Sequence, residues 1–211
     1  MNLQSFNDRH AASVAVADRI TTLLREALNR QPRATLVVSG GTSPVQCFTA
    51  LSGTRLPWER VNVTLTDERL VPADHEASNE RLVRSHLLLN AASRATFVPL
   101  RPESIAPIVS PFACALVGMG EDGHFASLFP DAPNLADALD ISNPAPLITI
   151  RTAGSPYPRV SMTLARLLRS DRILLLVFGA AKRRLLEASA GYPVNALLAQ
   201  DTTPVEIFWA P

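Results

Sequence analysis

The chain has 211 residues, of which 47% are hydrophobic and 18% charged, a composition sufficient for one well-packed core in a single domain spanning 1–211. Its 20 basic and 19 acidic residues give a net charge of +1, which excludes a strongly basic nucleic-acid-binding surface and an electrostatic membrane anchor. No segment approaches the roughly 18 apolar residues of a membrane helix, and two cysteines in apolar segments favour a reducing, cytoplasmic environment.

The first third of the chain predicts a helix, a strand and a second helix. Apolar residues at three- and four-residue spacing indicate an amphipathic helix over 10–30. The segment 34–41 reads as a short apolar strand that ends in paired glycines. Thr42, Ser43 and Pro44 then predict a new helix, with a hydroxyl cap and a proline in its first turn.

The middle of the chain continues the alternation of strands and helices. The apolar run 61–65 predicts a strand that leads into a polar segment, and Ser78 is typical of a residue that opens a helix. The run 115–120 predicts another strand. A glycine-rich loop follows it, and we expect a helix near 124–129.

The last third predicts three more strands. These are 147–150, 172–179 and 205–210, and the second of them leads into a helix. We expect Arg159 to stand at a helix start and the proline-rich segment 129–146 to form a loop.

The strands are continuously apolar and do not alternate between apolar and polar residues. This pattern predicts an α/β fold, a Rossmann-like three-layer sandwich with a mostly parallel sheet and helices on both faces. Ligands of such sheets bind at the carboxyl ends of the strands. Four polar clusters follow predicted strands and should converge on one rim bordered by the proline-rich loop: "SGGT", "TDER", "GMGEDGH" and "GAAKR".

The first cluster is suited to anion binding. Ser39, Gly40, Gly41 and Thr42 join a strand to a helix N-terminus, where free backbone amides and the helix dipole favour a phosphate. The alternative is a turn whose glycines serve only its geometry. Lys182, the single lysine of the chain, lies in the first turn of a predicted helix and is the better phosphate ligand of the "AAKRR" segment.

Two other clusters carry groups for acid and base chemistry. His124 lies in a glycine-rich turn, where an imidazole can take a proton from water or return one to a leaving oxygen. Asp67 can position a water or a sugar hydroxyl, while Arg69 offers a planar fork to an anion. The alternative for Asp67, Arg69 and Asn79 is a surface ion pair beside a helix cap.

The glycines of the third cluster also match the spacing of a dinucleotide-binding fingerprint. That interpretation is disfavoured, because Glu121 and Asp122 would bring two negative charges to the pyrophosphate. The acidic residues at the required distance, Asp137 and Asp140, lie in the proline-rich segment and do not end a strand. No histidine or cysteine pair has metal-ligand spacing, so we expect no metal site.

The chain resembles the 6-phosphogluconolactonase family in the order and the residues of its motifs. They are "SGGTSP", "TDERLVPADHEASNERLV", "VGMGEDGHFASLFP", "RVSMTL", "FGAAKR" and "PVNALL". This family shares its fold with glucosamine-6-phosphate deaminases and ribose-5-phosphate isomerases. The run "ASLFP" at 126–130 is the lactonase form, since the deaminases have an "AFNEP"-like run there. Phe125 replaces a usual threonine, so a hydroxyl near the catalytic turn is missing.

The resemblance implies hydrolysis of 6-phospho-D-glucono-1,5-lactone to 6-phosphogluconate, with no metal or organic cofactor and with a small-molecule sugar phosphate as the ligand of a monomer or homodimer. Asp67 and His124 would be the catalytic acid/base pair, and which of them is the primary base is a hypothesis. Amides near Gly120 would stabilise the oxyanion. The remaining substrate-binding residues would be Ser39, Gly40, Gly41, Thr42, Arg69 and Lys182 around the phosphate, with Asn79, Asp122 and Arg159 supporting the pocket.

Two rival functions remain at the level of sequence. The first is a sugar-phosphate isomerase or deaminase of the same fold, which would use Asp67 as the base for an enediol. The second is a non-catalytic sugar-phosphate-binding protein that keeps the phosphate loop without the chemistry.

Overall fold

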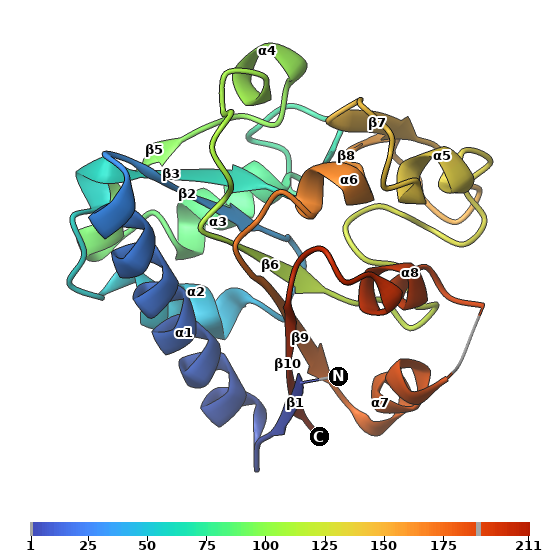
Figure 1. Ribbon diagram of the computed structural model, residues 1–211, viewed down its shortest axis with the longest axis horizontal. Coiled ribbons are helices and arrows are strands. Elements are labelled where there is room, and N and C mark those ends of the chain that lie inside the picture. The colour runs from blue at the N-terminus through green and yellow to red at the C-terminus, as the bar shows by residue number, and fades with distance from the viewer. Residues whose placement is uncertain (1, 189–190) are drawn as a thin grey trace.

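A seven-stranded sheet whose strands all run parallel forms the centre of the molecule (Figure 1). The computed structural model describes residues 2–188 and 191–211. The strands of this sheet are β1 (Asn2–Ser5), β2 (Ala34–Val38), β3 (Val61–Leu65), β5 (Thr96–Phe97), β6 (Cys114–Gly118), β9 (Ile173–Phe178) and β10 (Val205–Ala210). In space they follow the order β1-β10-β9-β6-β2-β3-β5. The predicted α/β fold with a mostly parallel sheet is confirmed.

A second, three-stranded sheet was not predicted. Its strands are antiparallel and are ordered β4-β8-β7, with bounds Asp67–Arg69, Arg159–Met162 and Leu147–Ile150. Arg159 is therefore the first residue of a strand, and the prediction of a helix start there was wrong. The reason is that β8 pairs with the nearby β7 and with β4, about ninety residues earlier in the sequence, and these ladder bonds outweigh local helix signals.

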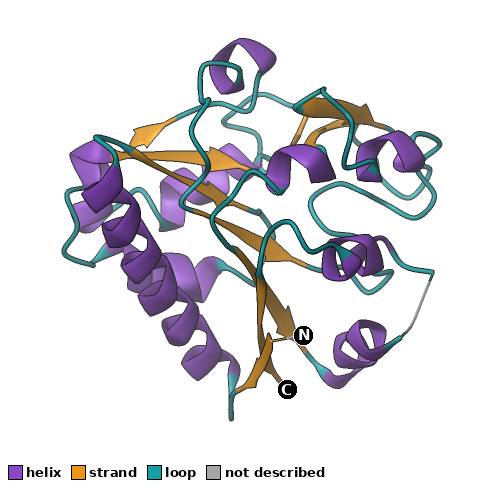
Figure 2. Cartoon of the chain, in the orientation of Figure 1, coloured by secondary structure: helices purple, strands orange, loops and turns teal. Residues whose placement is uncertain are grey.

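Helices cover both faces of the large sheet, with α1 and α2 on one side and α6, α7 and α8 on the other (Figures 1 and 2). The side chain of Asp8 caps α1 by accepting a hydrogen bond from the Ala11 amide at 2.7 Å, and the predicted apolar stripe of this helix is buried. The helices are α1 (Arg9–Arg30), α2 (Val45–Ser52), α3 (Asn79–His86), α4 (Pro102–Ile105), α5 (Leu135–Leu139), α6 (Leu164–Leu167), α7 (Ala180–Glu187) and α8 (Pro193–Ala199), with 3-10 turns at Trp58–Arg60 and Asn90–Arg94.

Three local predictions were wrong. The segment 124–129 is a set of turns and not a helix, because Ala126 has a φ of 49°, outside the right-handed helical region. Neither Thr42 nor Ser43 caps α2. The residue at the N-cap is Pro44, which makes no side-chain cap bond. The proline-rich segment 129–146, expected to be a loop, contains the short helix α5.

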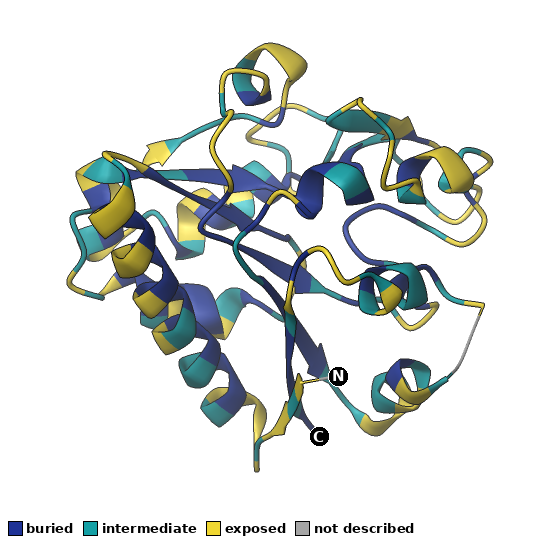
Figure 3. Cartoon of the chain, viewed as in Figure 1, coloured by how far each residue is buried: buried dark blue, intermediate teal, exposed yellow. Residues whose placement is uncertain are grey.

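The core lies along the large sheet (Figure 3). Every residue of β2 is buried, as are all residues of β9 before Phe178. The largest fully buried side chains include Trp58, Phe48, Phe112, Phe125 and Phe208. Among residues 2–188 and 191–211, no helix has the length and apolar character to cross a bilayer.

The strand order reverses between β2 and β6. From β2 the chain proceeds to β3 and β5 on one side, and from β6 it proceeds to β9 and β10 on the other. The loops that follow these two adjacent strands therefore diverge and leave a crevice at their carboxyl ends, which is the usual ligand position in open α/β sheets.

Arg19 ties α1 to β10 through Glu206, and we expect this pair to stabilise the fold. The guanidinium donates from Nε and Nη2 to the two carboxylate oxygens at 2.9 and 2.6 Å, and Glu206 is only 8% exposed. Arg19→Met should lower the free energy of unfolding by about 2 kcal/mol, because a buried carboxylate loses its principal partner.

The measurement is urea denaturation, and the control is Arg30→Met. Arg30 pairs with Asp171 at an exposed position, so its loss should cost less than about 0.5 kcal/mol. Equal losses in the two variants would contradict the role assigned to Arg19.

Candidate active site

A cavity of about 220 Å³ opens at the crevice between the ends of β2 and β6. The loops after β2, β3, β6 and β9 all reach it, so the four polar clusters of the sequence meet at one rim. Every residue expected in the site lines this cavity except Asp122, which contacts His124 instead. The lining residues are Ser39, Gly40, Gly41, Thr42, Ser43, Asp67, Arg69, Asn79, Gly118, Met119, Gly120, His124, Ala126, Arg159 and Lys182.

The glycine loop after β2 is packed closely against α3. A Cβ at Gly40 would lie 1.9 Å from Oδ1 of Asn79, so no side chain fits there. Gly41 has a φ of 87°, which favours glycine. The Ser39 hydroxyl accepts a hydrogen bond from the Gly118 amide at 3.2 Å and thereby joins the ends of β2 and β6. The glycines thus allow the backbone to border the cavity directly.

Glu68 anchors the second loop from outside the cavity. Its carboxylate accepts hydrogen bonds from the amides of Arg69, Asn79 and Glu80 at 2.7 to 2.8 Å and from the Ser78 hydroxyl at 3.0 Å. Negative charge at the start of α3 is favourable. Glu68 therefore fixes the position of Asn79, whose Nδ2 donates to the Asp67 carbonyl at 2.8 Å.

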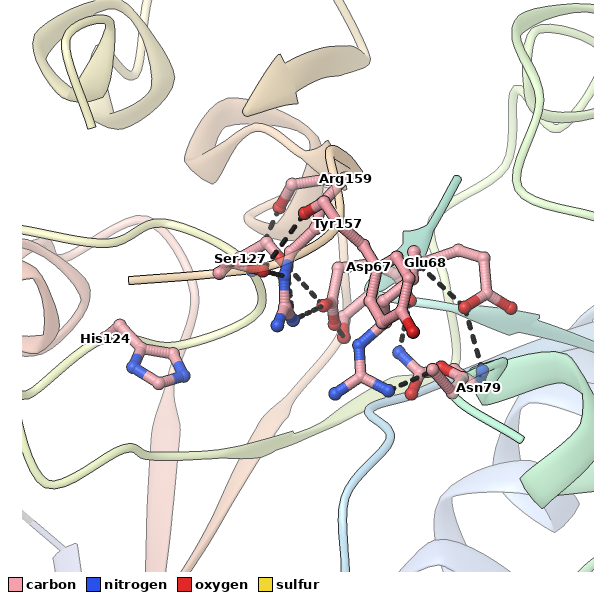
Figure 4. Close-up of polar contacts among 12 residues, drawn as sticks. Asp67, Glu68, Asn79, His124, Ser127, Tyr157 and Arg159 are labelled. Carbon is pink, nitrogen blue, oxygen red and sulfur yellow. Dashed lines mark hydrogen bonds and ion pairs between the residues drawn. The ribbon is translucent and has the colours of Figure 1, made fainter. Parts of the chain in front are cut away.

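Asp67 is a buried carboxylate held by two hydroxyl groups (Figure 4). Oδ1 accepts from the Thr66 hydroxyl at 2.8 Å, and Oδ2 accepts from the Ser127 hydroxyl at 2.5 Å. Arg159 Nη1 lies 3.8 Å from Oδ2. Thr66 and Ser127 were not predicted from the sequence, because neither hydroxyl has a local signal that reveals its partner.

Three cations surround the cavity, whereas Asp67 is the single carboxylate among its described lining residues. Arg69 donates from Nη1 to the Ala77 carbonyl at 2.6 Å, and Lys182 donates from Nζ to the Met119 carbonyl at 2.6 Å. Burial lowers the pKa of the Arg159 guanidinium, and the charge of Arg69 lowers it further. A bound anion would offset both effects, so the cavity is built for negative charge.

His124 is oriented by a carboxylate, by a glycine and by an aromatic ring. Its Nδ1 lies 2.5 Å from Oδ1 of Asp122, and its ring centroid is 4.2 Å from that of Phe129. A Cβ at Gly120 would lie 2.2 Å from the imidazole, so the ring fits only over a glycine. With Nδ1 engaged, Nε2 is the ring nitrogen available for proton transfer.

The turn that carries His124 removes the Gly120 amide from the group expected to bind the oxyanion. The Gly120 amide donates to the His124 carbonyl at 2.8 Å, so it is not free to bind an oxyanion. α8 supports the turn from behind, because the Val194 amide donates to the Gly123 carbonyl at 3.0 Å. Phe125 is fully buried. Its bulk therefore enters the core and does not alter the cavity.

The proline-rich segment contributes little to this rim. Phe129, near its start, contacts both His124 and Arg159. Residues 141 and 143–146 line a different cavity. In the described part of the chain, no group of three or more histidine, cysteine, aspartate or glutamate side chains is placed to hold a metal ion.

Comparison with known proteins identifies close relatives. Residues 7–209 match the family model described as glucosamine-6-phosphate isomerases/6-phosphogluconolactonase. The 6-phosphogluconolactonase of Caulobacter vibrioides is 39% identical and aligns over 100% of this chain and 97% of its own length. A crystal structure of a 6-phosphogluconolactonase from Shewanella baltica has a TM-score of 0.95 at 35% identity, covering 100% of this chain and 98% of that one. A monomeric glucosamine-6-phosphate deaminase, 17% identical with a TM-score of 0.74, shares the fold.

The contact between Gly40 and Asn79 predicts a coupled effect on stability. Gly40→Ala should cost about 2 kcal/mol of unfolding free energy, because the new methyl group displaces the Asn79 amide and breaks its bond to Asp67. In an Asn79→Ala background, which removes the opposing amide, the same change should cost less than about 1 kcal/mol.

A double-mutant cycle in urea measures the coupling. Gly53→Ala is the control, because a Cβ there meets no atom within 4 Å, and it should be nearly neutral. Additive losses at Gly40 and Asn79 would show that the predicted clash is relieved in some other way.

Proposed function

The chain belongs to the glucosamine-6-phosphate isomerase/6-phosphogluconolactonase family, and we propose that it hydrolyses 6-phospho-D-glucono-1,5-lactone to 6-phosphogluconate in the oxidative pentose phosphate pathway. One observation carries this proposal. A single cavity combines three cations, suited to a phosphate, with a histidine whose Nδ1 is held by the Asp122 carboxylate.

The phosphate group binds between the glycine loop and two of the cations. Gly40, Gly41 and Thr42 offer a backbone that a phosphate can approach closely, with the Ser39 hydroxyl holding the loop to β6. The proposed charged ligands are Arg69 and Lys182. Arg69 Nε is buried without a hydrogen-bond partner in the described part of the chain, so a phosphate oxygen would satisfy it. The Lys182 ammonium is a compact point charge that donates to the Met119 carbonyl in the loop after β6.

His124 acts as the base that activates water. A lactone is an activated ester, so a positioned water and one base suffice to open it. Asp122 keeps the proton on Nδ1, and Nε2 removes a proton from the water that attacks the carbonyl carbon. The protonated imidazole then returns this proton to the ring oxygen as the tetrahedral intermediate collapses.

Arg159 is the proposed partner of the developing oxyanion. Its guanidinium and the His124 ring both pack on Phe129, at 5.0 and 4.2 Å respectively, so a carbonyl placed between them meets a base and a cation. A charged donor aimed at the oxyanion stabilises the transition state more than the ground state. Arg159 takes the role that the engaged Gly120 amide cannot fill.

Asp67 positions these groups in this proposal and is not the primary base. Both of its oxygens already accept hydrogen bonds from hydroxyls, and it lies beside Arg159. Each oxygen of Asp67 thus holds a hydroxyl group in place, which suits a positioning role. The isomerase or deaminase reaction, which needs Asp67 as a free base, is therefore the weaker candidate.

The proposal describes a cytoplasmic enzyme that acts as a monomer or homodimer and whose steps require no metal or organic cofactor. Cys47 and Cys114 are free and buried. Burial raises the pKa of the Cys47 thiol to about 12 and that of Cys114 further, so both stay protonated. Two thiols kept in this form suit a reducing compartment.

His124→Asn should lower kcat for the lactone by about 10²- to 10⁴-fold with little change in KM, because the base is lost while the phosphate site remains. The measurement generates the lactone in situ and follows acid release at a pH where spontaneous hydrolysis is slow. His86→Asn, on α3, is the matched control and should be near normal.

The opposite pattern would reassign the base. If Asp67→Asn abolished turnover while His124→Asn retained it, Asp67 would be the primary base. Exchange of the proton at carbon 2 of a sugar phosphate in D₂O would favour the isomerase reaction instead.

Lys182→Met should raise KM for the phosphorylated lactone by about 30- to 100-fold, the loss expected for one charge-assisted phosphate contact. D-Glucono-1,5-lactone, which lacks the phosphate, provides the internal comparison. The wild type and the variant should hydrolyse it at similar, low efficiency. Arg184→Met, at an exposed position of the same helix, should behave as wild type. An equal loss on both substrates would place Lys182 at the reacting end of the cavity.

A further inference from the structure

A second cavity of about 450 Å³ lies at the amino-terminal ends of the strands of the large sheet, opposite the candidate active site. It is bordered by residues that precede β6, β9 and β10, whereas the candidate active site follows β2, β3, β6 and β9. The six residues of β9 alone span about 20 Å from the amino-terminal to the carboxyl-terminal end of this strand. The second cavity is therefore a separate place in the molecule, and nothing in the proposed reaction uses it.

Arg166 is a buried cation on the wall of this cavity. It is 5% exposed, its guanidinium stacks at 4.2 Å on the Phe112 ring, and its Nη2 donates to the Ile108 carbonyl at 2.7 Å. Its Nε is buried and finds no hydrogen-bond partner among residues 2–188 and 191–211. Burial, with a smaller contribution from Arg169, lowers the pKa of this guanidinium to about 10, so it remains charged at neutral pH.

No counter-charge for Arg166 lines the cavity in the described part of the chain. The charged lining residues are Arg166 and Arg169, and the second guanidinium donates from Nη2 to the Val109 carbonyl at 2.8 Å. Buried cations in proteins are normally paired, because an isolated one loses hydration without compensation. An unpaired cation and an orphaned donor on the same wall indicate a ligand that supplies negative charge.

Apart from Asn143 and Thr202, the rest of the cavity lining is apolar, and the cavity is formed in advance. Val109 and Ile141 are 71% and 59% exposed at its rim, although large apolar side chains are usually covered. The Thr163 hydroxyl donates to the Ala145 carbonyl at 2.8 Å and accepts from the Arg166 amide, so one residue fixes the loop and the helix that form the wall. A ligand would find the walls already in place.

We propose that this cavity binds a small organic anion whose carboxylate or phosphate group pairs with Arg166 and Arg169 and whose apolar body contacts Val109 and Ile141. Such a ligand satisfies the buried charge, the orphaned donor and the exposed apolar surface together. A sugar phosphate satisfies only the first two, because hydroxyl groups cover its carbon skeleton. The inference does not rest on the lactonase reaction.

Titration with 8-anilinonaphthalene-1-sulfonate, an aromatic anion that fluoresces in apolar sites, tests the proposal. We expect saturable binding to one site per chain. Val109→Glu, which adds a negative charge at an exposed rim position, should weaken binding at least tenfold, and Val109→Lys should keep or strengthen it. Both variants should retain normal lactone hydrolysis, which shows that they are folded. Equal affinities in the two variants would overturn the proposal.

Competition experiments separate the two halves of the ligand and the two cavities. N-Phenyl-1-naphthylamine, which lacks the sulfonate, should bind at least tenfold more weakly, and equal binding would rule out a role for the arginines. Benzoate or phenyl phosphate should displace the dye and thereby identify the preferred head group, while inorganic phosphate should be much less effective.

Displacement by 6-phosphogluconate would place the dye in the active site. Dye binding that increases on dilution, together with dissociation of a dimer, would show that a second copy of the chain covers the cavity. Either result would overturn the proposal.

Discussion

The pairing of β2 with β6 at the reversal of strand order is the constraint that positions the candidate site. The two strands are adjacent and parallel, yet their following loops leave in opposite directions. The Ser39 hydroxyl and the Gly118 amide join the two strand ends. Because the buried sheet fixes both ends, the glycine loop and the histidine turn face each other across a crevice that neither loop could form alone.

Charge balance explains why this crevice favours an anion. Asp67 is held by Thr66 and Ser127, and its charge is shared with Arg159. Arg69 and Lys182 contact carbonyl groups, which satisfy donors but do not neutralise charge. The pocket therefore keeps an excess of positive charge in a partly buried place, where electrostatic interactions are stronger than in water. The same imbalance, on a more apolar wall, distinguishes the cavity beside Arg166.

Arginine has a structural use in this chain that accounts for part of its abundance. Arg60 donates to the carbonyls of Leu28, in the last turn of α1, and of Gln31 and Pro32, just after it. Arg166 holds the loop before β6 in a similar way. A guanidinium has five donors in a rigid plane and can bridge several carbonyl groups at once. Lys182 is different, because it presents one compact charge to the cavity. The single lysine thus lies where only one carbonyl group is contacted and no bridge between several carbonyl groups is needed.

The sequence by itself determined the helix over 10–30, the strands β2, β3, β6, β9 and β10 of the large sheet and the loops that carry polar residues, since apolar periodicity and glycine reflect local preferences and burial. Only the tertiary structure decided that Arg159 begins a strand, that Glu68 binds the first amides of α3 and that the Gly120 amide is already bonded. Each of these depends on a partner that local sequence does not specify. The two edge strands β1 and β5 and the second cavity were not predicted, for the same reason. The neighbours of a short strand or of a buried arginine come from segments distant in sequence. The local sequence pattern does not identify these segments.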